Sequence, residues 1–491
     1  MKYAIDHIKD IVQGTFLQFR RNDPIEHLLL DSRRLIFSDT SLFFSLKGPR
    51  RDGSLFMEEL YRRGVRNFVV EDNPATHPLA DANIILVKDS LAALQQLAAY
   101  HRRQFTLPVI GITGSNGKTI VKEWLNQLLE DEYHIVRSPK SYNSQIGVPL
   151  SVWPLNEAHE LAIFEAGISR RGEMQRLAAI LQPTIGIFTN IGEAHSEGFT
   201  SLAEKAAEKL QLFEQAEWLI YNKDQHETEK ALAVWRTQVT KTATDAPRTG
   251  QRPALFSWGR AADATLSILS LEKKGGPAPS TTITARYEGD AFSFTVPFTD
   301  EASLENALHC VCVLLHFRQP LDAVRSKLLR LSPIAMRLEL KSGINHCSII
   351  NDSYSADLSS LSIALDFLSQ QQQHTRRTVI LSDFLESGLE ESALYTAIAR
   401  ALHHKQVDRL VGIGSRISAQ AALIGQGFPG ETAFYPSVDE FKRDLHHLHF
   451  RDETILIKGA RVFEFEEIDR WLSEQIHQTI MEVNQIGRAH V

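Results

Sequence analysis

One stretch, GITGSNGKT from Gly111 to Thr119, constrains the fold of this 491-residue chain more than any other feature. It follows the apolar run LPVI and precedes IVKEWLNQLLEDE, which has the apolar spacing of a helix. Backbone N–H groups in a glycine-rich turn at the start of a helix form a nest for anions. Lys118 can reach a terminal phosphate, and the hydroxyl of Thr119 can bind Mg²⁺. The stretch therefore predicts a nucleoside triphosphate site between a strand and a helix.

The glycine spacing is a variant of the usual phosphate loop. The pattern G-x-x-x-x-G-K-[ST] requires glycine at position 112, where this chain has Ile112, and the glycines lie instead at Gly111, Gly114 and Gly117. The alternative is a tight turn between a strand and a helix with an exposed lysine. The order of apolar run, glycines, Lys-Thr and helix favours the phosphate loop.

Apolar runs alternate with helical or polar segments from Leu107 onward. The first runs are LPVIGIT, YHIVRSP, ELAIFEAG, TIGIFTN and EWLIYN. Such alternation is typical of a mainly parallel sheet with helices on both faces. Residues 250–296 change to alternating strands, and the helical stretch SLENALHCVCVLLHF follows them. The runs CSIINDSY, RTVILSD, DRLVGIG and TILIKGA then repeat the first pattern. We therefore expect an α/β protein whose C-terminal part is a smaller, Rossmann-like domain.

The length is sufficient for about three domains of ordinary size. We expect an N-terminal α/β domain over residues 1–105, a central phosphate-loop domain over 106–318 and the Rossmann-like domain over 319–475. The second boundary is placed before Gln319-Pro320, where the helical stretch ends. Residues 476–491 form a tail.

Charge and composition exclude several classes of partner. The chain has 53 Lys and Arg against 60 Asp and Glu, a formal net charge of -7, and no block rich in Lys and Arg. We therefore expect no nucleic acid partner and no membrane partner. The N-terminus lacks the apolar core of a signal peptide and no apolar run approaches a membrane span, which predicts a cytoplasmic protein. Cys310, Cys312 and Cys347 are too few, and wrongly spaced, for a disulfide framework or a zinc site.

Two side chains after later strands are candidate metal ligands. Glu165 ends the run LAIFEAG, and His195 follows TIGIFTNIGEAH. Ligands of an open parallel sheet bind outside the carboxyl ends of its strands, so both side chains can face the phosphate loop. A carboxylate and an imidazole there can hold a divalent metal against phosphates. Taken singly, each has an ordinary alternative, a helix-capping acid for Glu165 and a loop histidine for His195.

These motifs, in this order, resemble the Mur ligase family over residues 25 to 470. The family's phosphate loop is similar to TGSNGKT, which implies ATP contacts by Gly114, Ser115, Asn116, Gly117, Lys118 and Thr119. Its metal-binding segments are similar to FEAGISRRGE with Glu165 and to TNIGEAH with His195. Its helix with a carbamylated lysine is similar to FTSLAEKAAEKLQLF, in which that lysine is Lys209.

The resemblance extends to all three expected domains. Asn306 in SLENAL matches an asparagine that contacts adenine, and Arg337 and Asp352 match C-terminal residues that close over ATP. The stretch KGARVFEFEEI matches the family's Lys-Gly-Ser-Arg segment. The first domain is similar to a uridine-binding region, and the implied UDP-substrate contacts are Asp31, Ser32 and Arg33, with Asn143 from YNSQIGVPL in the central domain.

The resemblance implies an ATP-dependent amide ligase of peptidoglycan precursor synthesis. The members with the most similar motifs join D-alanyl-D-alanine to UDP-N-acetylmuramoyl-tripeptide through an acyl phosphate. ATP and Mg²⁺ are then the cofactors, and both substrates are small molecules. The implied catalytic residues are Lys118, Lys209, His195 and Glu165. The implied metal ligands are Thr119, Glu165, His195 and Lys209 as its carbamate.

The chain also departs from the family pattern. It has YSADL in place of Tyr-Asn-Ala-Asn-Pro, Ala302 and Ser303 in place of a His-Asn pair, and RDGS in place of Asp-Gly-His. Two alternatives stay open, a related ligase similar to folylpolyglutamate synthetase and a non-catalytic ATP-binding scaffold. The third residue of the tripeptide, the oligomeric state and the base that deprotonates the amine are not set by the sequence.

The last residues raise a separate expectation. HQTIMEVN resembles the opening strand of an alanine racemase domain, whereas the final IGRAHV does not continue that resemblance. We expect that the natural chain continues into a racemase domain dependent on pyridoxal phosphate. The chain as given is expected to bind no pyridoxal phosphate.

Overall fold

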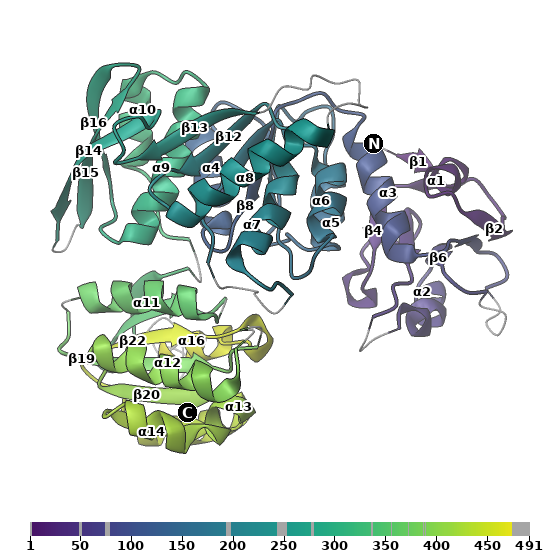
Figure 1. The fold of residues 1–491 in the computed structure, drawn as a ribbon. Helices are drawn as coiled ribbons and strands as arrows, with labels where there is room; N and C mark the ends of the chain where they lie inside the picture. Colours follow the sequence, from purple (N-terminus) through teal and green to yellow (C-terminus); the bar gives the residue numbers. More distant parts are fainter. Residues whose placement is uncertain are drawn as a thin grey trace, which may run out of the picture.

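The computed structural model describes residues 2–48, 52–73, 79–192, 198–242, 253–275, 279–334, 337–354, 356–371, 373–385, 387 and 389–473. These residues form three large sheets that follow one another along the chain, each with its own helices (Figure 1). The predicted α/β class with three domains is confirmed. The expected tail, residues 476–491, lies outside the described residues.

The first unit is built on a five-stranded sheet of order β2-β7-β6-β5-β4, in which only β2 is antiparallel to its neighbour. Its strands are β2 (Thr15–Gln18), β4 (His27–Leu29), β5 (Ser41–Phe44), β6 (Asn67–Val70) and β7 (Asn83–Leu86). The other elements are β1 (Tyr3–Ala4), β3 (Pro24–Ile25), α1 (Ile5–Ile11), α2 (Met57–Arg62) and α3 (Ser90–Arg102). Because strand side chains alternate between faces, Phe44 packs with α1 and α3 while Phe43 packs with α2.

The central unit contains a nine-stranded sheet of order β16-β15-β14-β13-β12-β11-β8-β10-β9. The strands from β9 to β14 pair in parallel, and β14, β15 and β16 pair antiparallel. The parallel strands are β8 (Val109–Thr113), β9 (Ile135–Arg137), β10 (Leu161–Glu165), β11 (Ile185–Phe188), β12 (Trp218–Asn222), β13 (Ala254–Gly259) and β14 (Leu266–Lys274). The last two strands are β15 (Ser280–Tyr287) and β16 (Asp290–Val296).

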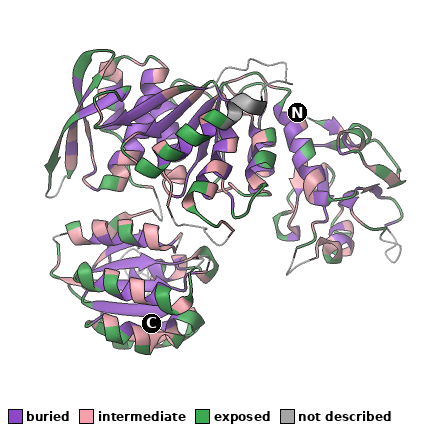
Figure 2. Ribbon diagram, viewed as in Figure 1, coloured by how far each residue is buried: buried purple, intermediate pink, exposed green. Residues whose placement is uncertain are grey.

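Helices cover both faces of this sheet, as predicted. They are α4 (Lys118–Leu129), α5 (Gly147–Val152), α6 (Glu173–Leu181), α7 (Leu202–Leu210), α8 (His226–Thr242), α9 (Glu301–His316) and α10 (Leu321–Leu328). Ile110 and Ile112 of β8 pack in one core with α4, α9 and α10, whereas Val109 packs in another with α5, α6 and α7. Figure 2 shows the parallel strands in the middle of the sheet buried and the outer faces of the helices exposed, while β14, β15 and β16 carry exposed residues.

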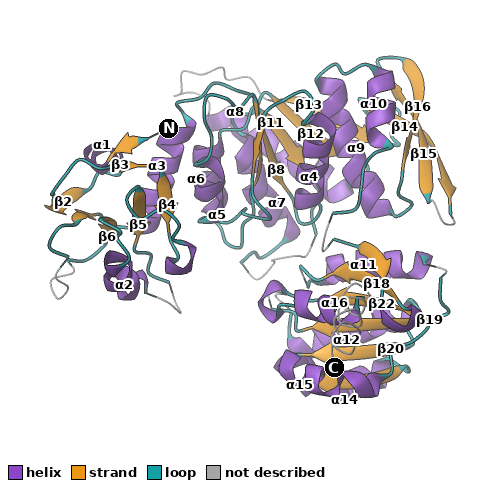
Figure 3. Ribbon diagram, turned by 180° about the vertical axis from the view of Figure 1, so that it is seen from behind, coloured by secondary structure: helices purple, strands orange, loops and turns teal. Residues whose placement is uncertain are grey.

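The third unit contains a six-stranded sheet of order β17-β18-β22-β19-β20-β21, parallel except for β17. Its strands are β17 (Glu339–Ser342), β18 (Ser348–Asp352), β19 (Arg376–Ser382), β20 (Arg409–Ile413), β21 (Glu431–Tyr435) and β22 (Glu453–Lys458). Its helices are α11 (Leu358–Gln370), α12 (Glu391–His404), α13 (Ser415–Ala419), α14 (Ala421–Gly427), α15 (Val438–Asp444) and α16 (Glu466–Leu472). Figures 1 and 3 show α11 on the side of this unit that faces the central unit.

The residue boundaries between the units stay a prediction, and α10 gives a reason to move the second one. This helix lies beyond the expected boundary at residue 318, yet Val324 and Leu328 are buried in the central core with strands β14 to β16. We therefore propose that the change of unit lies between Leu331 of the central core and Glu339, where the third sheet begins. No helix among the described residues is long and apolar enough to cross a membrane.

Candidate active site

The glycine-rich stretch forms a loop between β8 and α4, as predicted from the sequence. Gly114 has φ +147°, and a Cβ atom there would lie 2.0 Å from Thr189 Oγ1. Gly117 is the N-cap of α4 with φ +84°, and a Cβ atom there would lie 2.3 Å from Asn306 Oδ1. Both positions therefore require glycine, because side chains rarely adopt these angles and the space is already filled.

The end of β11 holds the loop in shape. Ser115 N–H donates to the Asn190 carbonyl oxygen at 2.9 Å, and Asn116 N–H donates to Asn190 Oδ1 at 2.9 Å. Thr189 Oγ1 donates to the Asn116 carbonyl oxygen at 2.6 Å. Sequence analysis missed Asn190, although it ends the predicted strand TIGIFTN. The order of the sheet, with β11 beside β8, explains why this pair reaches the loop.

Lys118 lies at the first position of α4 and is half-buried, so the alternative of a turn with an exposed lysine is wrong. Its Nζ donates to the carbonyl oxygens of Gly114 at 2.8 Å and Ser115 at 3.0 Å. Burial lowers the pKa of Lys118 to about 8; Arg337 also lowers this pKa, while the Glu165 carboxylate opposes the shift.

A second lysine approaches the same carbonyl group from α7. Lys209 is buried, and its Nζ donates to the Gly114 carbonyl oxygen at 3.1 Å. Lys205, four residues earlier on the same face of α7, is also buried and donates to the Gly192 carbonyl oxygen at 2.6 Å. Burial, with the nearby ammonium groups of Lys118 and Lys205, holds the pKa of Lys209 well below its usual value.

Glu165 ends β10 beside the loop and is fully buried. Its Oε2 accepts from Thr119 Oγ1 at 3.1 Å and from Asn143 Nδ2 at 3.4 Å. Thr119 Oγ1 also lies 2.9 Å from Ser141 Oγ. Two predicted metal ligands, Thr119 and Glu165, and the predicted substrate residue Asn143 therefore lie together at the start of α4.

A buried lysine that sequence analysis missed completes this group. Lys122 of α4 lies one turn beyond Lys118, and its Nζ is 3.2 Å from Glu165 Oε1. It also donates to the Ser138 carbonyl oxygen at 2.7 Å. A signal in the sequence was available, since Lys122 lies on the apolar face of an amphipathic helix. A lysine at such a position predicts a buried anionic partner, because lysine is rarely fully buried without one.

The oxygen atoms of this group fit a magnesium ion. Glu165 Oε1 is buried and has no hydrogen bond, its only close partner being the ammonium of Lys122 at 3.2 Å among the described residues, and the Thr119 hydroxyl lies against the other carboxylate oxygen. Carboxylate and hydroxyl oxygens are the hard ligands that Mg²⁺ takes. The predicted ligand His195 lies outside the described residues. Within the described ranges, no three His, Cys, Asp or Glu side chains form a metal cluster.

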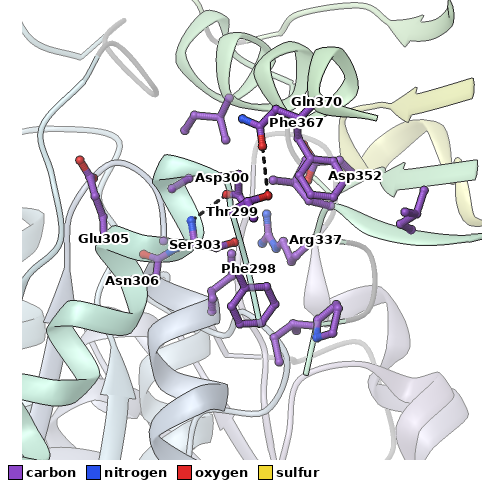
Figure 4. Close-up of a pocket in the computed structure, with 18 of the residues that line it drawn as sticks. Phe298, Thr299, Asp300, Ser303, Glu305, Asn306, Arg337, Asp352, Phe367 and Gln370 are labelled. Atoms are coloured by element: carbon purple, nitrogen blue, oxygen red, sulfur yellow. Dashed lines mark hydrogen bonds between the residues drawn. The ribbon is translucent and has the colours of Figure 1, made fainter. Parts of the chain in front are cut away.

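A cavity of about 730 Å³ opens beside the phosphate loop, between α9 and α11 (Figure 4). Five residues predicted to bind ATP line it: Asn116, Gly117, Asn306, Arg337 and Asp352. Apolar side chains from both units provide the other surfaces, namely Phe298, Ile334, Leu338 and Phe367. The structure thus brings residues that are distant in the sequence to one space with the apolar and polar surfaces that a nucleoside requires.

Polar contacts join the third unit to the loop at this cavity. Asn116 Nδ2 donates to Ser359 Oγ at 3.1 Å, and Arg337 Nη2 lies 3.4 Å from Ser141 Oγ. Asp352 is held by Lys458, whose Nζ lies 2.6 Å from Asp352 Oδ2. The third unit therefore contacts the phosphate loop directly.

The residues predicted to bind the UDP part of a substrate are not in this cavity. Asp31, Ser32 and Arg33 form the start of a short 3₁₀ turn in the first unit, where Asp31 accepts from Arg33 N–H at 3.1 Å. Hydrogen bonds from Arg33 lower the pKa of Asp31 to about 2. The neighbouring Arg34, which sequence analysis missed, donates to the hydroxyl of Tyr142, so this turn contacts the central unit next to Asn143.

Comparisons with known proteins agree with the motifs. The family model described as Mur ligase middle domain matches residues 112–314, and the one described as Mur ligase, glutamate ligase domain, matches residues 336–461. The chain belongs to the Mur ligase family. The predicted resemblance is confirmed, and with it the class of ATP-dependent amide ligase.

Curated relatives match along almost the whole chain. UDP-N-acetylmuramoyl-tripeptide--D-alanyl-D-alanine ligase of Bacillus subtilis is 28% identical over 484 residues, covering 96% of this chain and 99% of the relative. The Escherichia coli protein of the same name is 25% identical over 475 residues, covering 96% and 98%.

Solved structures of this family share the fold. A crystal structure of MurF from Acinetobacter baumannii matches with a TM-score of 0.80 at 22% identity, covering 96% of this chain and 98% of that chain. MurF ligase from Thermotoga maritima in complex with ADP matches with a TM-score of 0.72 at 19% identity, covering 92% and 98%. At these identities the likeness shows the fold.

Proposed function

We propose that this chain joins D-alanyl-D-alanine to UDP-N-acetylmuramoyl-tripeptide at the expense of ATP, in the synthesis of peptidoglycan precursors. The observation that carries the proposal is the convergence of Asn306, Arg337 and Asp352 with the phosphate loop on one cavity. The names and full-length coverage of the curated relatives support the choice of substrates. Because ATP is the phosphoryl donor, we place the protein in the cytoplasm.

The first step is phosphoryl transfer to the tripeptide. An oxygen of its terminal carboxylate attacks the γ-phosphorus of ATP, the bond to the β,γ-bridging oxygen breaks, and ADP leaves. Lys118 and the N–H groups at the start of α4 neutralise phosphate charge, and Asn306 and Arg337 hold the nucleotide. The work of the protein is therefore positioning and electrostatic stabilisation.

The second step forms the amide bond. The free amine of D-alanyl-D-alanine attacks the carbonyl carbon of the acyl phosphate, its C–O bond to phosphate breaks, and phosphate leaves while the amine loses a proton. Water would destroy the acyl phosphate. The contacts of the third unit with the loop, through Asn116 and Ser359, support a role for that unit in excluding water.

Four residues would hold Mg²⁺ in this reaction: Thr119, Glu165, His195 and Lys209 as its carbamate. Bound there, the ion would neutralise the charge of the phosphates. Asp31, Ser32, Arg33 and Asn143 would contact the UDP-linked substrate. The turn formed by the first three is tied to the central unit through Arg34 and Tyr142, which supports a substrate that spans the two units.

One assay separates this proposal from its alternatives. ADP formation is measured with ATP alone and with each substrate added singly or together. The proposal predicts turnover only with both substrates. Turnover with folate and glutamate instead would indicate the folylpolyglutamate synthetase alternative, and ATP binding without turnover would indicate a scaffold.

The phosphate-loop assignment is tested with Lys118→Ala. We expect turnover to fall by about 10²–10³-fold with the thermal unfolding midpoint little changed, because Lys118 donates to carbonyl groups of its own loop and to no other group among the described residues. The matched control is Lys230→Ala, which removes an exposed lysine of α8. Retained turnover in Lys118→Ala would contradict the assignment.

A further inference from the structure

Two guanidinium groups lie against the ring of Tyr354. The Cζ atom of Arg337 is 4.0 Å from the centroid of this ring, and that of Arg461 is 5.3 Å from it. Both distances are within the range of a cation–π interaction. Tyr354 therefore contacts an arginine from the segment before β17 and another from the turn after β22.

The third sheet brings these residues together. Tyr354 follows β18 and Arg461 follows β22, and these strands are parallel neighbours in which Asp352 pairs with Lys458. Parallel neighbours end at the same edge of a sheet, so the two following loops emerge side by side. Arg337 reaches the same ring from outside this pair of strands.

The group faces the phosphate loop. A small pocket of about 100 Å³ is lined by residues 115–120 of the loop together with Asn143, Arg337, Tyr354 and Asp357. The guanidinium of Arg337 also lies 3.4 Å from Ser141 Oγ of the central unit. Arg337 therefore extends from the ring of Tyr354 to the region where the phosphates of a nucleotide would lie.

We propose that Tyr354 is a positioning residue that holds Arg337 and Arg461 together at the phosphate loop through its aromatic face. The inference rests on the proposed role of Arg337 at the nucleotide. A free arginine side chain samples many rotamers, and two guanidinium groups repel each other. Stacking on a ring fixes the plane of the guanidinium and leaves its N–H groups free at the edge for phosphate oxygens.

The ring, rather than the hydroxyl group, is the part that the geometry requires, because both guanidinium groups lie over the ring. Tyr354→Phe keeps the ring and removes the hydroxyl. Tyr354→Leu removes the ring and keeps an apolar side chain. The two variants therefore separate the role of the ring from that of the hydroxyl group.

The experiment measures the dissociation constant for ATP, the KM for ATP and kcat of the full chain. We expect Tyr354→Phe to stay close to the wild type and Tyr354→Leu to weaken ATP binding about tenfold, at an unchanged thermal unfolding midpoint. The matched control is Tyr61→Leu, because Arg66 stacks on Tyr61 at 4.3 Å in the first unit; its ATP affinity should equal that of the wild type.

A double-mutant cycle tests whether the ring acts through arginine. The loss of ATP affinity in the double variant Arg337→Gln/Tyr354→Leu should be smaller than the sum of the two single losses, because each single variant already removes the contact between the ring and Arg337. The part that Tyr354→Leu adds to Arg337→Gln comes from Arg461. Additive losses would overturn the inference, as would equal effects of the Phe and Leu variants. If Tyr354→Leu fails to fold, Tyr354→Met takes its place in the cycle.

Failure of the proposed function gives a different result. In that case the wild type shows no turnover with both substrates. Tyr354→Leu would still bind ATP more weakly than Tyr354→Phe, because the dissociation constant for ATP does not depend on turnover. If the wild type turns over and Tyr354→Leu binds ATP as well as Tyr354→Phe does, the inference alone is overturned.

Discussion

Lys122 Nζ lies 3.2 Å from Glu165 Oε1, and both side chains are fully buried. A buried carboxylate is costly unless it is paired with a cation and hydrogen-bonded. Lys122 supplies the cation on one oxygen, while Thr119 and Asn143 donate to the other. The acid that ends β10 is thereby kept at the edge of the phosphate loop.

Removing the lysine should destabilise the protein strongly. Lys122→Met leaves Glu165 without its cation, and we expect the free energy of unfolding to fall by about 3–5 kcal/mol. Denaturant unfolding measures this change.

The double variant Lys122→Met/Glu165→Gln should recover part of the lost stability, because it also removes the unpaired carboxylate. The control Lys230→Met breaks an exposed pair with Glu227 and should change stability by under about 1 kcal/mol. Equal stabilities of Lys122→Met and the wild type would refute the argument.

Two glycines with similar backbone angles, one in the phosphate loop and one outside it, separate the effect of backbone strain from the effect on nucleotide binding. Gly117 and Gly172 are both N-caps of helices, with φ +84° and +77°. Alanine at either position should cost about 1–2 kcal/mol for the left-handed conformation. A Cβ atom at Gly117 would also lie 2.3 Å from Asn306 Oδ1, whereas nothing lies within 4 Å at Gly172.

We therefore expect Gly117→Ala alone to impair nucleotide binding. Its ATP dissociation constant should rise by at least about tenfold, the equivalent of ~1.4 kcal/mol, while that of Gly172→Ala stays unchanged. Isothermal titration with ATP measures both. An equal affinity of the two variants would show that the contact of Gly117 with Asn306 has no part in binding.

The sequence was sufficient to predict the elements that form the site, but not the contacts between elements that hold the site in shape. The strand, glycines, Lys118 and helix follow one another locally, so β8, the loop and α4 were predictable. Asn190 holds the loop only because β11 lies beside β8, an order that no local pattern contains. Sheet order similarly decides that Lys122 faces Glu165.

The second domain boundary shows the same limit. The end of a helical stretch before Gln319-Pro320 indicated a break, and α9 does end at His316. The sequence does not reveal which core the next helix joins, and α10 packs on the central sheet through Val324 and Leu328. Local signals mark the ends of elements, whereas domain membership depends on packing.

A buried histidine behind the loop should make stability depend on pH. His309 Nε2 lies 3.1 Å from the Thr189 carbonyl oxygen, and Trp258 Nε1 donates to His309 Nδ1 at 3.1 Å. Burial lowers the pKa of His309 from 6.5 to about 4. Between these values the unfolded chain binds a proton that the folded protein does not, so the free energy of unfolding falls as the pH drops from about 6.5 to about 4.

The contribution of His309 to this fall is on the order of 3 kcal/mol. His309→Gln can accept from Trp258 and donate to Thr189 without titrating. We therefore expect its loss of stability between pH 6.5 and 4 to be smaller than that of the wild type. Urea unfolding at several pH values measures the difference. Parallel curves for the two proteins would contradict the assignment, since the remaining groups are shared.

Lys209 has the surroundings of a lysine that loses its proton. It is buried, its Nζ contacts the Gly114 carbonyl oxygen, and Lys118 and Lys205 are close enough to lower its pKa. A neutral amine can attack CO₂: a bond forms between nitrogen and carbon, and a proton leaves the nitrogen. The product carbamate is an anion, which the neighbouring ammonium groups would stabilise.

We therefore predict that Lys209 is carbamylated in the active protein. With ¹³C-labelled bicarbonate, a carbamate carbon signal should appear in the NMR spectrum of the wild type, persist in Lys118→Gln and disappear in Lys209→Gln. Lys209→Ala and Lys209→Arg should both lose turnover by at least about 10²-fold, because neither side chain can form the carbamate and a guanidinium keeps its charge.

The control for the NMR signal is Lys118→Gln. Lys118 also has a lowered pKa, so it is another amine of the site that could react with CO₂. Full turnover in Lys209→Ala, or a signal that persists in Lys209→Gln, would refute the prediction.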